Sequence, residues 1–421
     1  MNFSDSERIG RVLEQMGLLK AENELSCDIF IVNACSVRQT GIDRIYGKFK
    51  AWKKKKPHLT ILTGCVVLDD KKTFGKYFDY ILDINDLAKF PQIILNHFPE
   101  FFAKGKNLDF CQNSYFEAAP LSEKKYSCLV PIMTGCNNFC SYCVVPYTRG
   151  REKSRSVAEV LKEVKDFVAQ GAKEIILLGQ NVNSYNPADK ENFSKENPYK
   201  DFFPALLWEV NQIPKINRIF FTSSHPKDVS DELIDALTLP KMVNYFHLPM
   251  QSGDDNILAK MNRKYSVFDY KKIIEKVKKK KPQICLGTDL VIGFPGETAE
   301  EFENSAKLIF EIGYDIIYHS MYSQRAGTKA AELKDDVSKE EKKRRWQVID
   351  EIVKQHNLKK NKIFEGKFLE VLFFKFERGF YFGYSREMKT VRVKSDENLI
   401  GQIKNVKINK GMEWALEGEV Q

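Results

Sequence analysis

The sequence has no run of apolar residues long enough to cross a membrane, which takes roughly 20 uncharged residues in a helix. Its first ten residues, MNFSDSERIG, also lack the basic and apolar regions of a secretory signal peptide. From these two absences we expect a cytoplasmic protein with no membrane partner. Thiols stay reduced in the cytoplasm, so clustered cysteines there favour metal binding over disulfide bonds.

Charge of one sign is not in large excess either. The 421 residues include 66 Lys and Arg and 57 Asp and Glu, which gives a net charge of +9. This balance permits an acidic partner such as nucleic acid, but it is equally explained by solubility. The length allows two or three domains, each with a substantial core.

The nine cysteines are unevenly placed. GCNNFCSYC holds the one tight cluster, Cys136, Cys140 and Cys143, with C-x₃-C-x₂-C spacing. Cys35 and Cys65 each follow an apolar run, DIFIV and LTILT, that predicts a buried strand. Both are therefore expected at a strand end, where α/β proteins bind ligands. The others are isolated, and we expect small buried or incidental residues at Cys27, Cys111, Cys128 and Cys285.

Three clustered thiolates favour an iron–sulfur cluster over a structural zinc site. Zinc normally takes four protein ligands when its role is structural. A cubane cluster held by three cysteines leaves one iron open to a small molecule, so such a site is chemically active. The alternative is an incomplete zinc knuckle that a distant cysteine or histidine completes.

Apolar runs alternate with polar loops and amphipathic segments through the middle of the chain. The runs are EIILLG, RIFFTSS, YFHLPM, ICLGTDLVIGF and IIYHSMYS. This alternation predicts parallel strands with crossover helices and polar loops gathered at one rim. GQNVN in one loop offers Gly179, Gln180 and Asn181 for close backbone approach and amide hydrogen bonds, and GFPGE places Glu297 in a tight loop. The alternative is that these side chains only cap turns and helices.

The two ends of the chain have sequence patterns that differ from the pattern in the middle. Before residue 120, a helical pattern and two strand-like runs predict a smaller α/β domain. Beyond Phe364, five short strands with glycine turns predict a small β-barrel. Aromatic residues on one of these strands could stack on bases or form the barrel core: Phe380, Tyr381, Phe382 and Tyr384.

The order of these motifs resembles a known family. C-x₃-C-x₂-C opening an α/β region is the signature of radical S-adenosylmethionine enzymes. GCNNFCSYCVVPYTRGREKSRS, LLGQNVNSY, FTSSHP, HLPMQSGDDNILAKMNRKYS, TDLVIGFPGETAEEF and YSQRAGTKAA together resemble the methylthiotransferases, and among them the MiaB-type tRNA enzymes. The resemblance covers nearly the whole chain. It implies a methylthiotransferase domain over 1–120, a radical S-adenosylmethionine partial barrel with a connector helix over 121–360, and a TRAM RNA-binding barrel over 361–421.

The resemblance also implies the cofactors, which are S-adenosylmethionine and two [4Fe–4S] clusters. Cys136, Cys140 and Cys143 would hold the catalytic cluster, whose open iron chelates S-adenosylmethionine. Cys35 and Cys65 match two of the three cysteines that hold the auxiliary cluster.

The same resemblance implies a cofactor pocket. The segments of the family that line this pocket match Gly179, Gln180, Asn181 and Glu297. Arg149 and Arg151 follow the cysteine cluster, and we expect them to face cofactor or RNA.

One cysteine of the family pattern is missing. Family members begin with a strand that ends in Gly-Cys-Gln-Met-Asn, whereas this chain starts at Met1 and Asn2. A start site assigned too late is one explanation, and a protein with an incomplete auxiliary site is the other. Cys27 and Cys111 are remote substitutes for the missing ligand.

The implied activity is methylthiolation of carbon 2 of isopentenylated adenosine beside the tRNA anticodon. The expected partners are the anticodon stem-loop and an electron donor such as flavodoxin or ferredoxin, and we expect a monomer. Sister enzymes would instead modify threonylcarbamoyl-adenosine in tRNA or an aspartate of a ribosomal protein. A catalytically incomplete RNA-binding iron–sulfur protein is the alternative from a different class.

Overall fold

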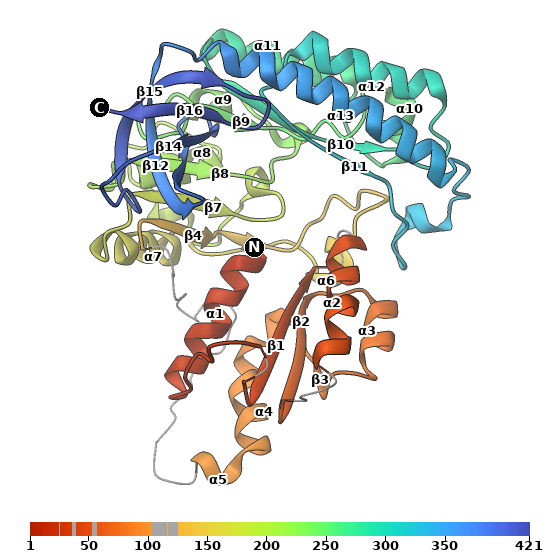
Figure 1. Ribbon diagram of the computed structural model, residues 1–421, viewed down its shortest axis with the longest axis vertical. Helices are drawn as coiled ribbons and strands as arrows, with labels where there is room; N and C mark the ends of the chain where they lie inside the picture. The colour runs from red at the N-terminus through yellow and green to blue at the C-terminus, as the bar shows by residue number, and fades with distance from the viewer. Residues whose placement is uncertain (25, 36–38, 53–56, 103–115, 117–124) are drawn as a thin grey trace. The chain divides into compact units, whose positions relative to one another are not determined.

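The computed structural model describes residues 1–421 except 25, 36–38, 53–56, 103–115 and 117–124, so Cys111 lies outside the described residues. The chain divides into two compact units (Figure 1). Unit 1 consists of Met1–Glu123, Thr134–Arg155 and Ser323–Glu332, and unit 2 of Lys124–Met133, Ser156–Tyr322 and Leu333–Gln421. No helix in the described part of the chain is long and apolar enough to span a membrane.

Unit 1 is built on a small parallel sheet. The two apolar runs form β1 (Ile29–Cys35) and β2 (Leu59–Cys65), and β3 (Tyr80–Ile81) completes the order β1-β2-β3. All seven residues of β2 are buried, because the sheet is covered on both faces. Parallel pairing brings the carboxyl ends of β1 and β2 to the same edge.

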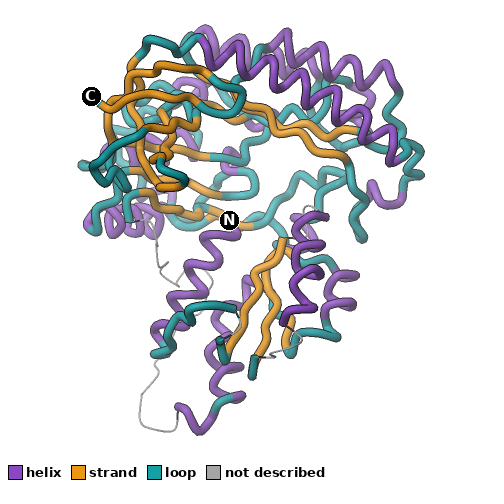
Figure 2. The backbone as a smooth tube through the Cα atoms, viewed as in Figure 1, coloured by secondary structure: helices purple, strands orange, loops and turns teal. Residues whose placement is uncertain are grey.

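Helices cover the two faces of this sheet (Figure 2). On one face, Ile9 and Val12 of α1 (Asn2–Gln15) share a core with Leu59 and Ile61. On the other face, Leu62 packs with residues of α2 and α3. The remaining elements of unit 1 are α2 (Gln39–Trp52), α3 (Leu68–Phe74), the 3-10 helices η1 (Ile84–Lys89) and η5 (Lys329–Glu332), α4 (Phe90–His97), α5 (Pro99–Phe102), α6 (Val145–Thr148) and β6 (Lys153–Ser154), which pairs with β5 (Met133–Thr134).

Unit 2 contains six parallel strands in two three-stranded sheets. One sheet has the order β4-β7-β8, with β4 (Ser127–Pro131), β7 (Glu174–Leu178) and β8 (Arg218–Phe221). The other has the order β11-β10-β9, with β9 (Tyr245–His247), β10 (Cys285–Ile292) and β11 (Ile316–Met321). An isolated parallel bridge pairs Ile219 of β8 with Met242, which lies shortly before β9. It links the first sheet to the segment that leads into the second. The arrangement is the expected partial barrel.

Crossover helices surround these strands. Their apolar faces meet the strands in one large core that includes Val160, Leu206, Ile274, Ile309 and Ile349. Helices α12 and α13 lie side by side, and α13 packs against β10 and β11 (Figure 1). The helices are α7 (Val157–Ala169), α8 (Phe202–Gln212), α9 (Asp231–Ala236), α10 (Asp255–Lys260), α11 (Val267–Lys280), α12 (Ala299–Ile312) and α13 (Lys339–Lys362), with short 3-10 turns η2 (Val182–Ser184), η3 (Lys190–Asn192) and η4 (Pro226–Asp228).

The end of the chain forms a closed five-stranded barrel, as expected. Its strand order is β12-β13-β14-β16-β15. Inward-facing residues such as Val371, Phe373, Val391 and Val406 are fully buried. The strands are β12 (Phe368–Glu377), β13 (Phe380–Ser385), β14 (Thr390–Val393), β15 (Ile403–Gly411) and β16 (Leu416–Val420). The α/β, partial-barrel and small-barrel fold class expected from the sequence is therefore confirmed.

The small barrel is hydrogen-bonded to the rest of unit 2. Arg218, which is fully buried, donates from Nη1 to the carbonyl of Tyr384 at 2.9 Å and from Nη2 to the carbonyl of Ser385 at 2.8 Å. Its Nε lies 3.2 Å from Glu174 Oε1. Deleting the barrel would remove two acceptors from a buried cation, which is costly. The small barrel is therefore held to the partial barrel through main-chain acceptors.

Candidate active site

The three clustered cysteines lie on one loop of unit 1 between the paired strands β5 and β6. Gly135 opens the loop at φ +80°, and a Cβ there would lie 2.1 Å from the carbonyl oxygen of Arg151, so only glycine fits. The Cys136 N–H donates to the Gly150 carbonyl at 3.2 Å, and the Cys143 N–H donates to the Cys140 carbonyl at 2.9 Å. These contacts hold the loop closed on itself.

The thiols of this loop are largely shielded from water. Cys136 and Cys140 are buried and Cys143 is partly buried. Burial raises the pKa of the Cys136 thiol to about 11, so a bound cation must replace its proton before it acts as a ligand. No group of three His, Cys, Asp or Glu side chains among the described residues is positioned to hold a metal ion. The three thiols lie on one loop and are soft ligands of the kind that iron–sulfur clusters need. Their role as cluster ligands stays a prediction.

Cys35 and Cys65 are brought together by the sheet of unit 1. They are paired residues at the carboxyl ends of β1 and β2. Cys65 is buried and Cys35 is partly buried. Cys27 cannot join them as the structure stands, because it precedes β1 and a strand of this length spans roughly 20 Å.

Arg149 connects these two groups of cysteines. Its side chain is buried, and Nε donates to Cys65 Sγ at 2.9 Å. Nη2 donates to Asp5 Oδ2 at 2.5 Å and to Asn2 Oδ1 at 3.2 Å. Burial raises the pKa of the Cys65 thiol, and Arg149 opposes that rise. Arg149 therefore faces a predicted cluster ligand inside unit 1, a contact that no sequence pattern indicated. Arg151 is exposed and stacks on the Phe139 ring at 4.3 Å.

In unit 2, Gly179, Gln180 and Asn181 follow β7 directly. A Cβ on Gly179 would lie 2.6 Å from the Met133 side chain, so the backbone passes closer than another residue would allow. Asn181 is buried and donates from Nδ2 to Asp228 Oδ2 at 2.7 Å. The oxygens Gln180 Oε1 and Asn181 Oδ1 are buried without a hydrogen-bond partner in the described structure. Two such acceptors fit a ligand that carries N–H groups.

Backbone strain marks the neighbouring strand ends. Ser223, just after β8, has φ +70°, and Gln251, after β9, has φ +67°. Non-glycine residues rarely adopt this conformation, and those that do cluster at binding sites. Both lie in the motif strings FTSSHP and HLPMQSG, but nothing in the residue types predicted the strain.

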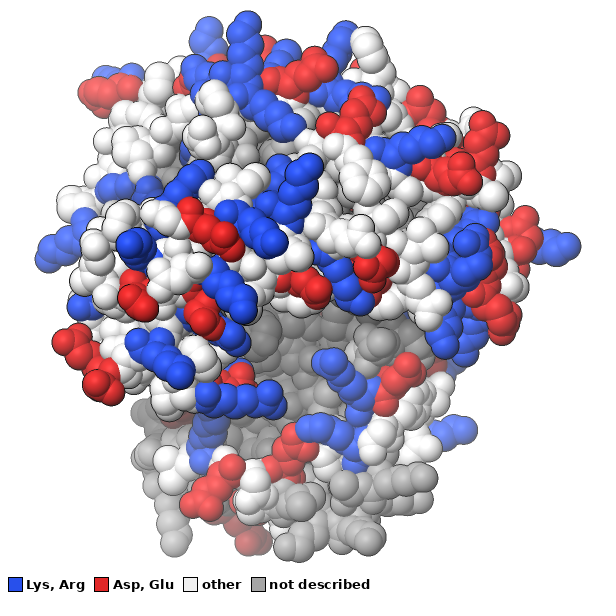
Figure 3. Space-filling view, turned by 45° about the horizontal axis from the view of Figure 1, so that its top comes forward, with Lys and Arg blue, Asp and Glu red and all other residues white. Residues whose placement is uncertain are grey.

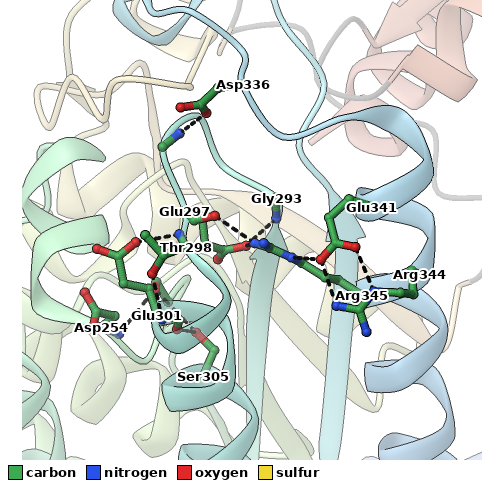
Figure 4. Close-up of polar contacts among 12 residues, drawn as sticks. Asp254, Gly293, Glu297, Thr298, Glu301, Ser305, Asp336, Glu341, Arg344 and Arg345 are labelled. Carbon is green, nitrogen blue, oxygen red and sulfur yellow. Dashed lines mark hydrogen bonds and ion pairs between the residues drawn. The ribbon is translucent and has the colours of Figure 1, made fainter.

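Glu297 lies in a network of its own (Figure 4). Its Oε2 accepts from the Gly293 N–H at 2.8 Å and from Arg345 Nη1 at 2.8 Å. Arg345 Nη1 also donates to the Glu297 carbonyl at 2.9 Å, and its Nε donates to Glu341 Oε1 at 2.7 Å. The carboxylate is buried, so it fixes the GFPGE loop against α13. Its direct contact with a cofactor stays a prediction.

A polar chain inside the partial barrel was not expected from the sequence. The Tyr245 hydroxyl lies 3.0 Å from His247 Nδ1, and His247 Nε2 lies 2.7 Å from Asp289 Oδ2. Burial raises the pKa of Tyr245, so the hydroxyl keeps its proton. The only sequence signal was that a histidine and an aspartate interrupt the apolar runs YFHLPM and ICLGTDLVIGF.

Comparison with known proteins gives the class first. Residues 130–309 match the radical SAM superfamily, and residues 1–83 match the uncharacterized protein family UPF0004. A chain that joins these two regions is a radical S-adenosylmethionine protein with an N-terminal UPF0004 domain. The described cysteine loop, residues 135–150, lies inside the first match.

The relatives narrow the class to one family. A protein of Acetivibrio thermocellus named tRNA-2-methylthio-N(6)-dimethylallyladenosine synthase is 39% identical over 435 residues, covering 100% of this chain and 88% of that protein. Proteins of the same name from Clostridium botulinum and a Thermoanaerobacter species are each 38% identical, with 100% of this chain and 94% and 90% of theirs covered. This chain belongs to the family of tRNA-2-methylthio-N(6)-dimethylallyladenosine synthases.

A solved structure supports the fold alone. The radical S-adenosylmethionine methyltransferase TsrM from Kitasatospora setae, with a tryptophan substrate and an S-adenosylmethionine analogue bound, is 12% identical to this chain. The match covers 78% of this chain and 68% of that one, with a TM-score of 0.50.

Proposed function

We propose that this chain is a tRNA methylthiotransferase that forms 2-methylthio-isopentenyladenosine beside the anticodon. The observation that carries the proposal is full-length similarity to proteins named for that reaction, together with the three-cysteine loop in unit 1. Residues 1–120, 121–360 and 361–421 would serve as auxiliary-cluster, radical and RNA-binding parts. S-adenosylmethionine and two [4Fe–4S] clusters are the cofactors.

The chain offers thiols for both clusters. Cys136, Cys140 and Cys143 would hold one, and Cys35 with Cys65 would supply two ligands of the other. When bound, the clusters would supply the electron that cleaves S-adenosylmethionine and the sulfur that is transferred. Both sets consist of buried or partly buried cysteines, which fits soft iron–sulfur ligation.

Other residues would bind and orient rather than react. The unpartnered oxygens of Gln180 and Asn181 would accept hydrogen bonds from S-adenosylmethionine, and Gly179 would admit it close to the backbone. The bond from Arg345 to Glu297 would keep the GFPGE loop in place while the cofactor binds. Fixed groups of this kind lower the cost of orienting a substrate.

The small barrel would bind the RNA through one aromatic residue in particular. Phe380 lies beneath the Arg392 guanidinium at 4.7 Å and the Lys394 ammonium at 5.3 Å. A ring flanked by cations suits both stacking on a base and contact with phosphate. Tyr381 instead packs on the barrel core, and Tyr384 stacks on Phe374 at 4.7 Å. Basic and acidic side chains are interspersed on the face drawn in Figure 3, so recognition would depend on such local groups rather than on bulk charge.

The cellular setting follows from this activity. We place the enzyme in the cytoplasm, where its tRNA substrate is modified, and expect it to work as a monomer. A flavodoxin or ferredoxin would supply electrons.

The test is a direct assay of the product. The protein is reconstituted anaerobically with iron and sulfide, and is given S-adenosylmethionine, a reductant and tRNA that carries isopentenyladenosine. Mass spectrometry of the digested nucleosides should show a methylthio group on that nucleoside. Product on threonylcarbamoyl-adenosine instead, with none on isopentenyladenosine, would overturn the assignment.

A second candidate, an RNA-binding protein without the transfer activity, is favoured by one observation. The sheet of unit 1 presents two cysteines at its edge, and Cys27 lies at the other end of β1. Tight tRNA binding together with S-adenosylmethionine cleavage but no methylthio product would favour this candidate.

A further inference from the structure

The interior of the partial barrel contains a hydrogen-bonded chain of three side chains, Tyr245, His247 and Asp289. Side chains alternate between the two faces of a strand. Phe246 and Leu290 point to the core beneath the helices, so the three polar residues point to the inner face. The pairs His247–Gly287 and Asp289–Tyr318 lie opposite one another on adjacent strands, which places them on that same face.

The chain is built into the fold rather than incidental. A Cβ on Gly287 would lie 1.7 Å from the Tyr245 hydroxyl and 2.8 Å from His247 Nδ1. Only glycine leaves room for the tyrosine to reach the histidine. The strand that carries Asp289 ends at Ile292, and the N–H of the next residue, Gly293, donates to Glu297 (Figure 4). The carboxyl end of the strand that carries Asp289 is thus held in place.

The direction of the hydrogen bonds identifies the kind of ligand. His247 Nε2 donates to Asp289 whether the ring is neutral or protonated, so the chain ends on a carboxylate. One oxygen, Oδ2, takes that bond, and within the described residues Oδ1 has no partner. The Asp289 side chain is 33% exposed. Its free oxygen can only accept, so a ligand must present a donor.

An aromatic ring lies beside this acceptor. Tyr318 is half exposed, and its ring centroid is 5.8 Å from that of His247. An enzyme that reacts with a base in RNA must unstack it, and such enzymes stack the base on an aromatic ring and read its polar edge. In an adenine substituted once on N6, the ring nitrogens only accept, and N6–H is the one donor of the base.

We propose that Asp289 reads the N6–H of the target adenine, with Tyr318 as its stacking surface and with His247 and Tyr245 as positioning residues. This inference rests on the proposed function, because it assumes that the target is an adenine with one N6 substituent. The same chemistry could recognise the adenine of S-adenosylmethionine, and the experiment separates the two.

The probes are two anticodon stem-loops that differ only in whether N6 of the target adenine carries a hydrogen or a methyl group. One carries N6-isopentenyladenosine and the other N6-methyl-N6-isopentenyladenosine, which lacks the N–H. Affinities are measured by fluorescence anisotropy with the reconstituted protein. The unaltered protein should bind the first at least about tenfold more tightly, the usual worth of a hydrogen bond to a charged group. In Asp289→Ala the two affinities should be equal. An unchanged ratio in this variant, or no preference in the unaltered protein, overturns the proposal.

Variants of the positioning residues Tyr245 and His247 test the proposal even where Asp289→Ala does not fold. Tyr245→Phe should lower the preference while the affinity for the methylated loop stays the same. His247→Gln, which keeps a donor, should retain more of the preference than His247→Ala. Tyr314→Phe is the control, because its hydroxyl bonds Tyr270 in the core and not this chain. A ratio that falls equally in all of these variants would indicate a merely structural effect and overturn the proposal.

Two further measurements distinguish the possible failures. If Asp289→Ala weakens S-adenosylmethionine binding about tenfold or more and leaves the stem-loop ratio unchanged, the carboxylate reads the cofactor, and the proposal is wrong. If the stem-loop ratio behaves as expected but no methylthio product forms, the proposed function fails and the recognition of N6–H stands.

Discussion

Arg149 donates from Nε to the Sγ of Cys65 at 2.9 Å, inside unit 1. The contact ties the loop of Cys136, Cys140 and Cys143 to the end of β2. Asp5 completes the arrangement, because its carboxylate neutralises the guanidinium where both side chains are buried. The Cys65 thiol therefore lies against a buried ion pair whose arginine belongs to the cysteine loop.

Arg149→Gln should destabilise unit 1. Removing one partner of a buried ion pair leaves the other charge uncompensated and costs about 3 kcal/mol. The double variant Asp5→Asn/Arg149→Gln should recover most of that loss, since no lone charge remains. Urea unfolding of the metal-free protein measures both. Arg11→Gln, which breaks an exposed pair with Glu14, should cost at most about 0.5 kcal/mol.

Cys136→Ala, Cys140→Ala and Cys143→Ala should each abolish formation of 5′-deoxyadenosine from S-adenosylmethionine. The fold should survive, because the loop adds little to the cores of either unit. Chromatography of the reaction mixture and circular dichroism of each variant check the two parts. Cys27→Ala is the matched control and should cleave the cofactor normally. Cleavage by any of the three variants would contradict the cluster assignment.

Among the described residues, the sheet of unit 1 supplies two thiolates for the auxiliary cluster, Cys35 and Cys65. The chain should load about four irons firmly and the second cluster only in part, because two thiolates anchor a cubane poorly. Adding Gly-Cys-Gln before Met1 should raise the content to about eight irons per chain, and adding Gly-Ser-Gln should not. Iron and sulfide analysis after anaerobic reconstitution measures this. Eight irons in the unextended chain would mean that another residue completes the site.

Phe380→Ala should weaken tRNA binding about tenfold, since loss of one stacked base costs roughly 1–3 kcal/mol. Filter binding at two salt concentrations measures the effect, which should change little with salt because the ring carries no charge. Trp414→Ala is the control, as it removes another exposed aromatic side chain of the barrel. Equal losses in both variants would mean that Phe380 has no special role.

His225 makes stability depend on pH. Burial, with Arg263 and Lys227 nearby, lowers its pKa to about 2, and its ordinary pKa is 6.5. The unfolded chain therefore binds a proton below about pH 6.5 that the folded chain does not. Stability is complete above that pH and is lost as the pH falls, by about 1 kcal/mol between 6.5 and 5.5. Urea unfolding across this range should show the loss, and His225→Gln should remove it while the exposed His58→Gln should not.

The sequence predicted the fold well where periodicity is strong. The apolar runs before Cys35 and Cys65 became β1 and β2, and the alternating pattern became the partial barrel. The C-x₃-C-x₂-C spacing identified a loop that the structure keeps together. Each of these signals is local in the chain, which is why it can be read from residue types.

Contacts between distant residues could not be read in this way. Arg149 and Cys65 are 84 positions apart, and His247 and Asp289 are 42 apart. Arg345 reaches Glu297 across 48 positions, and this bond holds the GFPGE loop. Such pairs depend on how the strands and helices pack. No pattern along the chain indicates them.

The bonds from Arg218 to the carbonyls of Tyr384 and Ser385 have an evolutionary consequence. Every residue has a main-chain carbonyl, so this attachment does not depend on which side chains the barrel carries at those positions. Lys173 likewise donates to the Gly401 carbonyl at 2.7 Å. Substitutions at Tyr384 can therefore accumulate without loss of these bonds, whereas Arg386 and Lys389 attach the barrel through their own side chains. A lineage can change such positions while inheriting the angle at which the barrel is presented.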